Sequence, residues 1–410
     1  MEQTYLTSVN IVKVRHLQNI TIPLDTNKRK HLILTGKNGS GKTSVLKALA
    51  EHFRFVIGNF YTRERIQEMI DHYKGQLTGG KTEAGKQKDI STRVNIAMWE
   101  EKMQKWMSGA VTECTSFSEL REKYASGRFI LAYYKADRLL KVEISSTIEN
   151  IKLQDKYELG DTPGTKLVKY MVGLKATQAF AQQKKDVARA AEIEKWFDRF
   201  ERILKRIFDD PTLKLDFDID TFKFRILQNK REPFDFNTMA SGYSAVFEIV
   251  NDLIMRMENS QSTSMEGIVL IDEIDTHLHL ELQRTILPFL TELFPNIQFI
   301  VSTHSPFILS SIDNAVIFDL ETGKLVENGL SNYPYDGIVE SFFEADKLSY
   351  DMRAKLERYK ELTSKSDLQD EDYAEIVDLE HDLDEIPDFL SPEIASEYSR
   401  MKLEFSNRGC

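Results

Sequence analysis

The amino-acid sequence predicts an α/β fold in which a mixed or parallel sheet is flanked by helices, with an inserted helical arm and an acidic helical region near its end. Two observations carry this prediction. Residues 31–35, 268–271 and 297–301 are short apolar runs typical of buried strands, and a helical pattern at 281–293 separates the last two. A strand, a helix and a second strand in this order form a crossover, which makes a parallel sheet.

The chain begins with a pattern of two or three strands. Apolar residues alternate loosely with polar ones through residues 6–14 and 20–24, and the run His31–Thr35 follows. From Ser44 to Phe53 the pattern is helical. The glycine-rich segment between the run and the helix is therefore bounded by a strand on one side and a helix on the other.

This segment, residues 36–43, reads Gly-Lys-Asn-Gly-Ser-Gly-Lys-Thr and has the complete spacing of a phosphate-binding loop. In such a loop, backbone N–H groups surround the phosphate oxygens, Lys42 reaches the β- and γ-phosphates, and Thr43 holds Mg²⁺. The alternative is a glycine-rich turn that carries lysine by chance, and the flanking strand and helix argue against it. We expect a nucleoside triphosphate to be bound by Gly36, Lys37, Asn38, Gly39, Ser40, Gly41, Lys42, Thr43 and Ser44.

The middle of the chain is predicted to be largely helical. Residues 58–127 show a polar helical pattern, broken at Gly79-Gly80, and residues 129–134 return to a buried strand. In residues 166–209, apolar side chains recur at spacings of three and four, which favours one side of an intramolecular helical hairpin, although packing on a second subunit is open. Residues 213–227 alternate with one phase slip and predict a β-hairpin.

A second group of polar residues follows the strands at 268–271 and 297–301. Asp272 and Glu273 come directly after the first, where open α/β sheets bind ligands. We expect Asp272 to hold Mg²⁺ and Glu273 to orient the water that attacks the γ-phosphate. His304 follows the next strand and could sense that phosphate. A lone histidine at a strand end is more often structural, but the acid pair on the neighbouring strand favours a functional role.

The composition is typical of a soluble globular protein. The 410 residues are 41% hydrophobic and 29% charged, and no apolar stretch approaches the roughly 20 residues that cross a bilayer. Neither does the amino terminus resemble a signal peptide, so a cytoplasmic location without membrane partners is expected. Cys114 and Cys410 lack metal-ligand spacing and are interpreted as idle or buried thiols.

The net charge of −11 lies almost wholly near the end of the sequence. Residues 341–410 hold 9 Lys or Arg and 19 Asp or Glu, a balance of −10, whereas residues 1–340 hold 45 and 46. This acidic region is more often a solvated helical face than a ligand site, although it could dock a basic partner. Net charge gives no support for general DNA binding, which needs clustered Lys and Arg.

Four segments together resemble a known family. The loop Gly36–Thr43, Ser241-Gly242 before a helix, Asp272-Glu273 with the following Ile-Asp-Thr-His-Leu-His, and Ser302-Thr303-His304-Ser305-Pro306 look like the ATP-binding-cassette (ABC) ATPases of the SMC and RecF type. More narrowly, they resemble bacterial ATPases allied to OLD nucleases and to Septu-type antiphage systems. The matching segments cover about residues 1–55 and 235–330.

The resemblance implies that the nucleotide is ATP with Mg²⁺, that Glu273, His304 and Lys42 are catalytic, and that the protein is a homodimer or a higher oligomer of dimers. In such a dimer Ser241 and Gly242 of one subunit touch the γ-phosphate held by Lys42 of the other. Asp275 would lie in a loop that crosses the interface. His277 and His279 fit that loop better than a zinc site.

The sequence departs from the family pattern at two places. Tyr243 stands in the signature, Met239-Ala240-Ser241-Gly242-Tyr243-Ser244, where a small or acidic residue is usual, so ATP turnover is expected to be altered or slow. The glutamine expected after an early strand is not evident, and residues 133–138 occupy the place where it should lie.

The resemblance also implies a division into parts. Residues 1–57 would form one lobe of an ABC-type ATPase head and 236–330 the other. Residues 58–235 would form the helical insertion, with strand 129–134 and hairpin 213–227 belonging to the head. Residues 331–410 would be the acidic helical region.

Three functions compete for such a chain. The first is an ATPase that regulates an effector protein in antiphage defence. An OLD protein would carry the Asp-x-Asp pair of its nuclease domain on strands, whereas Asp382-x-Asp384 lies in a helical pattern. The effector is therefore expected in trans, with a nuclease as the expected class. The second is a DNA-repair ATPase of the RecF type, which needs a basic groove. Lys135, Arg138 and Lys141 together with Lys184, Lys185 and Arg189 could supply one, although a solvated helix face explains the latter group equally well. The third, a transporter subunit, is disfavoured by the long insertion.

Overall fold

The computed structural model describes residues 3–58, 63–77, 83–138, 140–144, 147–229, 231–259, 265–333, 337–339, 350–365, 367–384 and 392–407. The chain divides into two compact units, Met1–Tyr333 and Pro334–Cys410, and each is considered separately below. Gly79, Gly80 and Cys410, which entered the sequence predictions, lie outside the described residues.

The first unit is built on a six-stranded sheet with the order β11-β10-β3-β9-β8-β5. All neighbouring pairs from β10 to β5 are parallel, and β11 is antiparallel to β10. The predicted mixed sheet flanked by helices is thereby confirmed. The strands are β3 (His31–Thr35), β5 (Phe129–Tyr134), β8 (Glu266–Ile271), β9 (Ile297–Ser302), β10 (Ala315–Asp319) and β11 (Leu325–Val326).

A second, antiparallel sheet has the order β2-β1-β4. It consists of β1 (Leu6–Val14), β2 (Leu17–Pro23) and β4 (Gly109–Cys114). The strand β4 corrects the expectation that residues 58–127 are helical throughout. Its pairing with β1 buries Ala110 and Val111, so a contact with a strand about a hundred residues earlier decides its conformation.

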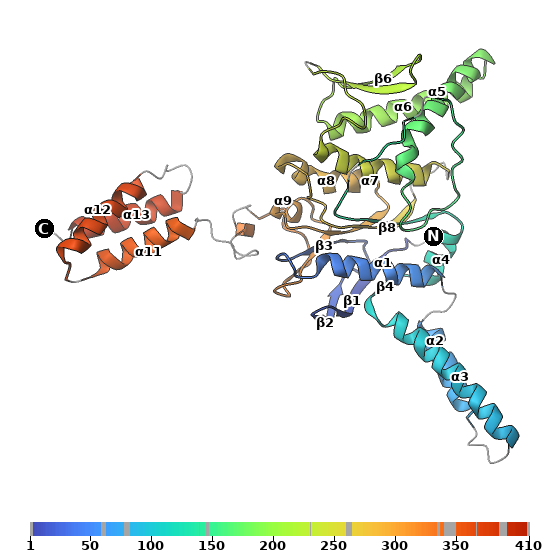
Figure 1. Cartoon of the computed structure of the whole chain (residues 1–410), viewed down its shortest axis with the longest axis horizontal. Helices are drawn as coiled ribbons and strands as arrows, with labels where there is room; N and C mark the ends of the chain where they lie inside the picture. The colour runs from blue at the N-terminus through green and yellow to red at the C-terminus, as the bar shows by residue number, and fades with distance from the viewer. Residues whose placement is uncertain are drawn as a thin grey trace. The chain divides into compact units, whose positions relative to one another are not determined.

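Helices cover both faces of the six-stranded sheet (Figure 1). On one face lie α1 (Lys42–Gly58), α4 (Phe117–Ala125) and the small sheet, and their apolar residues share one core with Leu32, Leu34, Ile268 and Leu270. On the other face lie α7 (Ser241–Glu258) and α8 (Leu280–Leu293). The alternation of side chains along each strand supplies apolar residues to both layers.

Two helical hairpins extend from this core. The first pairs α2 (Arg63–Gly75) with α3 (Glu83–Trp106), where Ile66, Ile70, Trp99 and Trp106 form an apolar cluster with Val56. The second pairs α5 (Leu167–Gln183), which follows the short turn η1 (Pro163–Lys166), with α6 (Val187–Ile207). It confirms the helical hairpin predicted within residues 166–209.

The predicted β-hairpin is also confirmed, because β6 (Lys214–Asp218) and β7 (Lys223–Leu227) form an antiparallel two-stranded sheet. Cys114 is a free thiol, and burial raises its pKa to about 12. It therefore stays protonated and unreactive at neutral pH, as the sequence predicted.

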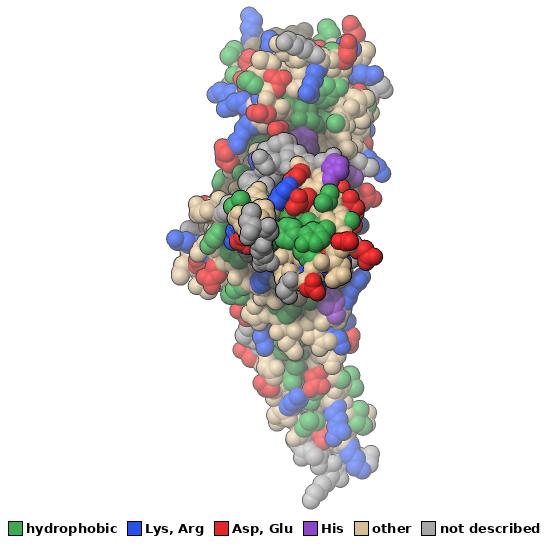
Figure 2. Space-filling view, turned by 90° about the vertical axis from the view of Figure 1, so that its left-hand side faces the viewer, with side chains coloured by type: hydrophobic (Ala, Val, Ile, Leu, Met, Phe, Trp, Pro, Cys, Tyr) green, Lys and Arg blue, Asp and Glu red, His purple; other side chains and the backbone are tan. Residues whose placement is uncertain are grey.

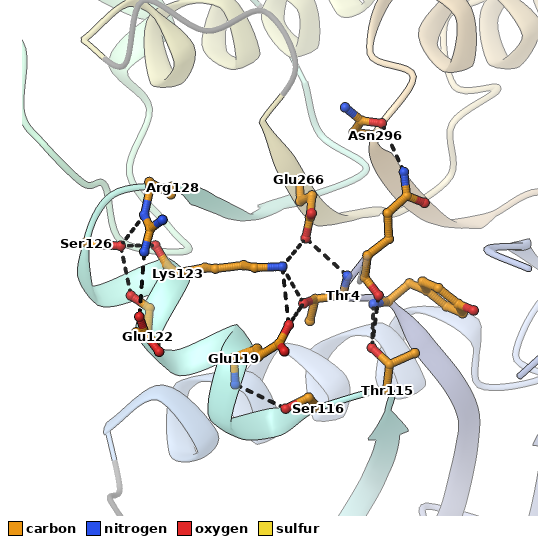
Figure 3. A network of polar contacts seen from close by, with 12 residues as sticks. Thr4, Thr115, Ser116, Glu119, Glu122, Lys123, Ser126, Arg128, Glu266 and Asn296 are labelled. Carbon is orange, nitrogen blue, oxygen red and sulfur yellow. Dashed lines mark hydrogen bonds and ion pairs between the residues drawn. The ribbon is translucent and has the colours of Figure 1, made fainter. Parts of the chain in front are cut away.

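A polar network ties the small sheet to the large one at the edge where β8 begins (Figure 3). Lys123 on α4 donates to Glu266 at 2.9 Å and to the Thr4 hydroxyl at 2.9 Å, and the Thr4 N–H donates to Glu266 at 3.1 Å. Lys123 also lies 3.5 Å from Glu119. The ammonium is buried, and this cluster fixes the starts of β1 and β8 relative to α4.

The second unit is a small helical bundle of α11 (Tyr350–Ser364), α12 (Asp370–Asp384) and α13 (Pro392–Ser406). Tyr359, Leu362, Ile376, Leu383, Tyr398 and Met401 form its core. Asp382 and Asp384 lie on α12, as predicted, and pair with Lys355 and Lys402. Among the helices of the described ranges, none is both long and apolar enough to span a bilayer.

Candidate nucleotide site

The phosphate-binding loop lies between β3 and α1, as the sequence predicted. Its backbone depends on glycine at both ends. Gly36 has φ of +130°, and a Cβ there would lie 2.8 Å from the Ser40 hydroxyl oxygen. Gly41 has φ of +104°, and its Cβ would lie 2.9 Å from Leu17. These conformations turn successive backbone N–H groups toward the space in front of the loop.

Lys42 is 4% exposed and curls back into the loop. Its Nζ donates to the carbonyl oxygens of Gly36 at 2.8 Å and Lys37 at 3.1 Å. Burial lowers the pKa of Lys42, and the nearby carboxylates of Glu273, Asp275 and Asp272 oppose that shift. A buried ammonium held by two loop carbonyls is ready to exchange them for phosphate oxygens.

The acid pair meets the loop through a chain of hydroxyl groups. The Thr43 hydroxyl donates to Asp272 Oδ1 at 3.1 Å, and the Ser302 hydroxyl donates to the same oxygen at 2.7 Å. The Ser302 oxygen also accepts from the Glu273 N–H at 2.7 Å. The parallel strands β3, β8 and β9 end at the same edge of the sheet. Thr43 and Ser302 therefore meet at Asp272, although 259 positions separate them in the sequence.

These residues suit a magnesium ion. The Thr43 hydroxyl and the Asp272 carboxylate are oxygen ligands of the kind that Mg²⁺ prefers, and they already lie within hydrogen-bond distance of each other. The Ser40 hydroxyl is buried in the loop without a hydrogen-bond partner, so the loop holds a polar group that a phosphate could satisfy. Thr43 and Asp272 are the residues that would hold the ion.

His304 lies beside Lys42, with 3.5 Å between Nδ1 and the lysine Nζ. Burial lowers the pKa of His304, and the Lys42 charge lowers it further. The imidazole is therefore neutral at pH 7. The preceding Thr303 hydroxyl donates to Asp275 at 2.6 Å, which links the segment after β9 to the loop after Glu273.

Ser241 and Gly242 begin α7. Ser241 is exposed, and a Cβ on Gly242 would lie 2.9 Å from the His277 carbonyl oxygen, so the first turn of α7 packs against the loop that follows the acid pair. Within the part of the chain that the structure describes, no hydrogen bond joins either residue to residues 36–44. Hydrogen bonds within one chain therefore link Lys42 to His304 and Thr43 to Asp272 and Glu273, and among the described residues none links Ser241 or Gly242 to this set.

The other signature residues have local packing partners. The Tyr243 ring lies 4.3 Å from that of Phe208 and 6.0 Å from that of His279, between centroids. His279 Nδ1 caps α8 by accepting from the Leu282 N–H at 3.4 Å. Over the described ranges, no group of three or more His, Cys, Asp or Glu side chains is arranged to hold a metal ion.

The sequence reasoning missed the contacts of Arg138, which it named as one residue that could supply a basic DNA groove. The structure contradicts that assignment, because Arg138 is only 1% exposed. Its guanidinium donates to the carbonyl oxygens of Lys135 at 2.8 Å and Glu273 at 2.8 Å, and to that of Asp272. An arginine shortly after a buried strand gave no sequence signal for these contacts with a strand 134 residues away.

Residues 112–310 match the protein family described as "AAA domain, putative AbiEii toxin, Type IV TA system". The matched range includes Ser241, Asp272, Glu273 and His304 and lies after the phosphate loop. This match, which spans just under half of the chain, makes the chain similar to AAA-type ATPase domains.

The chain is also similar to proteins named for Septu and retron systems. It is 27% identical over 335 residues to "Septu protein PtuA" of Bacillus mycoides (strain KBAB4), which covers 80% of this chain and 41% of that protein. It is 34% identical over 143 residues to "Retron Ec83 probable ATPase" of Escherichia coli, which covers 33% of this chain and 26% of that protein. The chain thus spans less than half the length of these curated relatives.

Among solved structures, the SMC head domain from Thermotoga maritima aligns with a TM-score of 0.35 and 12% sequence identity, covering 77% of this chain and 94% of that one.

Proposed function

We propose that this chain is an ABC-type ATPase that binds and hydrolyses ATP, dimerises through its nucleotide sites, and thereby regulates an effector protein in antiphage defence. The observation that carries the proposal is the continuous set of contacts from Thr43 through Asp272 and Ser302 to Glu273 at one edge of the sheet. This arrangement puts a phosphate-binding loop, oxygen ligands for a cation and the Glu273 carboxylate, which accepts from the Thr276 hydroxyl at 3.2 Å, in one place.

Each residue has a distinct task in hydrolysis. Lys42 would exchange the Gly36 and Lys37 carbonyls for β- and γ-phosphate oxygens. Bound Mg²⁺ would neutralise phosphate charge, and Thr43 and Asp272 would hold it. Glu273 would accept a hydrogen bond from the attacking water and orient it, while the neutral His304 beside Lys42 would bond to the γ-phosphate.

Support for dimerisation comes from Ser241 and Gly242, which form no hydrogen bond with the phosphate loop of their own chain among the described residues. Ser241 is exposed at the first turn of an 18-residue helix, where backbone N–H groups and the helix dipole favour a phosphate. A second copy facing this one would bring that helix end to the other chain's nucleotide. The proposed assembly is a homodimer or a higher oligomer built from such dimers.

The proposal of an effector in trans rests on similarity to the Septu and retron proteins and on the second unit. Asp382 and Asp384 pair with Lys355 and Lys402 on helices, so these acids do not form an open nuclease site. We propose that a separate protein, with a nuclease as the expected class, acts with this ATPase in the cytoplasm. Co-purification with the product of a neighbouring gene tests this part.

A DNA-binding ATPase of the RecF type is the second candidate, and one feature favours it. A cavity of about 570 Å³ between α5, α6 and α7 is lined by Trp196, Arg199 and Arg202, a combination of aromatic and basic side chains that suits nucleic acid. Two observations weigh against it. Arg199 lies 3.6 Å from Glu258, and basic and acidic side chains are interspersed on the face shown in Figure 2. Salt-sensitive DNA binding that is lost in an Arg199→Ala/Arg202→Ala variant would favour this candidate.

The Glu273→Gln variant tests the main proposal. It keeps the shape of the side chain but removes the carboxylate, so we expect unchanged ATP affinity, turnover reduced at least ~100-fold, and an ATP-dependent dimer on light scattering. Lys42→Ala is the control that should neither bind ATP nor dimerise with it. Wild-type turnover in Glu273→Gln would refute the assignment of Glu273, and unchanged ATP affinity in Lys42→Ala would refute the phosphate loop.

A further inference from the structure

Arg138 is a buried cation bound almost entirely to backbone oxygens. It follows β5, is 1% exposed, and donates to the carbonyls of Lys135, Asp272 and Glu273. Burying a guanidinium costs several kcal/mol unless hydrogen bonds and countercharges compensate. An apolar side chain could fill this place without the free-energy cost of burying a charge. The contacts of Arg138 with Asp272 and Glu273 therefore need an explanation.

The two peptide groups that Arg138 binds belong to the acid pair. Glu273 has φ of +46°, in the left-handed region that non-glycine residues rarely adopt. Its N–H is held by the Ser302 hydroxyl at 2.7 Å and its carbonyl by Arg138 at 2.8 Å. The backbone of Glu273 is therefore fixed at both ends in a conformation that it would not keep by itself, and this conformation sets the direction of its carboxylate.

The charge of Arg138 is balanced from α7. Glu248 on that helix raises the pKa of Arg138 more than any other carboxylate, although burial lowers it more strongly. Burial raises the pKa of Glu248, and the positive charge of Arg138 has the largest effect in the opposite direction. Glu248 Oε2 is itself buried without a hydrogen-bond partner. Arg138 thus lies between the helix that begins with Ser241 and the loop that carries Glu273.

We propose that Arg138 is a positioning residue that holds Glu273 in the geometry required for ATP hydrolysis, an inference that rests on the proposed function. It is only 1% exposed and acts through the backbone of Glu273. Because Arg138 does not contact the phosphate loop, its loss should slow the chemical step and leave ATP binding intact.

Arg138→Met tests this inference, because methionine occupies similar space without donors. We expect kcat to fall ~100-fold, the loss typical of misplacing a catalytic group by about 1 Å, with an ATP affinity within threefold of wild type. Arg138→Lys should fall between the two, since one ammonium cannot bridge both carbonyls as a planar guanidinium does. Arg206→Met, which removes an exposed arginine paired with Glu292, is the control and should keep wild-type kcat.

A second readout separates positioning from a general structural defect. If Arg138 acts through Glu273, Arg138→Met should prolong the lifetime of the ATP-bound dimer as a weaker form of Glu273→Gln, and the double variant should match Glu273→Gln alone. A loss of ATP affinity or of the dimer, or an additive effect in the double variant, would overturn the inference. If Arg138→Met does not fold, Arg138→Lys decides by the same measurements.

The outcome for the wild-type chain keeps this inference apart from the proposed function. A wild-type chain that does not hydrolyse ATP refutes the proposed function itself. A wild-type chain that does, together with Arg138 variants of unchanged kcat, overturns only the role of Arg138.

Discussion

Ser302 joins the two acids of the site, so Ser302→Ala should affect both stability and turnover. Its side chain is fully buried, and its hydroxyl donates to Asp272 Oδ1 and accepts from the Glu273 N–H, each at 2.7 Å. Removing a hydrogen bond to a charged acceptor costs ~1.5–3 kcal/mol, and leaving the Glu273 N–H without a partner adds ~1–3 kcal/mol. The two contributions overlap because they share one oxygen, and we expect a loss of about 3 kcal/mol.

Urea unfolding followed by tryptophan fluorescence measures this loss. The three tryptophans, Trp99, Trp106 and Trp196, all lie in the unit Met1–Tyr333, so the signal reports on that unit alone. Ser310→Ala is the matched control, because its hydroxyl bonds only to carbonyls of its own helical turn, and it should cost less than about 0.5 kcal/mol. Turnover of Ser302→Ala should fall because Asp272 and Glu273 lose their common anchor.

One result would refute this reasoning. If Ser302→Ala loses less than about 1 kcal/mol, a water molecule or a relaxed backbone replaces the hydroxyl, and Ser302 is not what fixes the acid pair. If Ser302→Ala loses much stability but keeps full turnover, Ser302 stabilises the fold without positioning Asp272 and Glu273 for hydrolysis.

The remaining predictions concern stability. Lys123→Met leaves Glu266 without its ammonium partner and should destabilise the first unit by about 2–3 kcal/mol in the same assay. This is at the low end for buried ion pairs because the Glu266 side chain is 20% exposed. The control Lys105→Met removes an exposed ion pair and should change the stability little. Burial lowers the pKa of His31 to about 3 and that of His52 to about 4. Both are neutral in the folded state and take up a proton on unfolding below pH ~6.5, so stability is full above that pH and falls as the pH drops toward the folded values. Each histidine should lower the free energy of unfolding by about 2 kcal/mol at pH 5 relative to pH 8. His52→Gln should remove the part of this loss that is due to His52. If the variant loses as much stability between pH 8 and pH 5 as the wild type does, the role of His52 is contradicted.

The sequence predicted those parts of the site whose signals are local. The phosphate loop, the acid pair and His304 each follow an apolar strand directly, and parallel strands bring such positions to one edge. Glycine at positions 36 and 41 follows from the same loop geometry, as does the helix that begins at Lys42. Because β3, β8 and β9 run in the same direction, it was enough to know that these residues follow the strands in the sequence to place them at the same edge of the sheet.

Contacts between distant segments could not be predicted in this way. The strand β4 depends on pairing with β1, and its six residues have no pattern that distinguishes them from a helical turn. Arg138 looked like a surface cation, since nothing local shows that two of its acceptors are the carbonyls of Asp272 and Glu273, which follow β8. In both cases tertiary contacts decide what the local sequence leaves open.

The helix α7 presents Ser241 and Gly242 from a rigid base, which bears on how a second copy would use them. Asp252 and Arg256 form a buried ion pair at 2.6 Å, and Asp252 also accepts from the Tyr134 hydroxyl at 2.7 Å on β5. The helix is thus bonded to the sheet at its centre, while its first turn packs on the His277 carbonyl. Since little of this helix would have to be ordered on contact with a second copy, α7 would add little to the conformational entropy cost of the proposed dimerisation. Nucleotide, and not folding of α7, should then control whether two copies associate, as a switch driven by ATP requires.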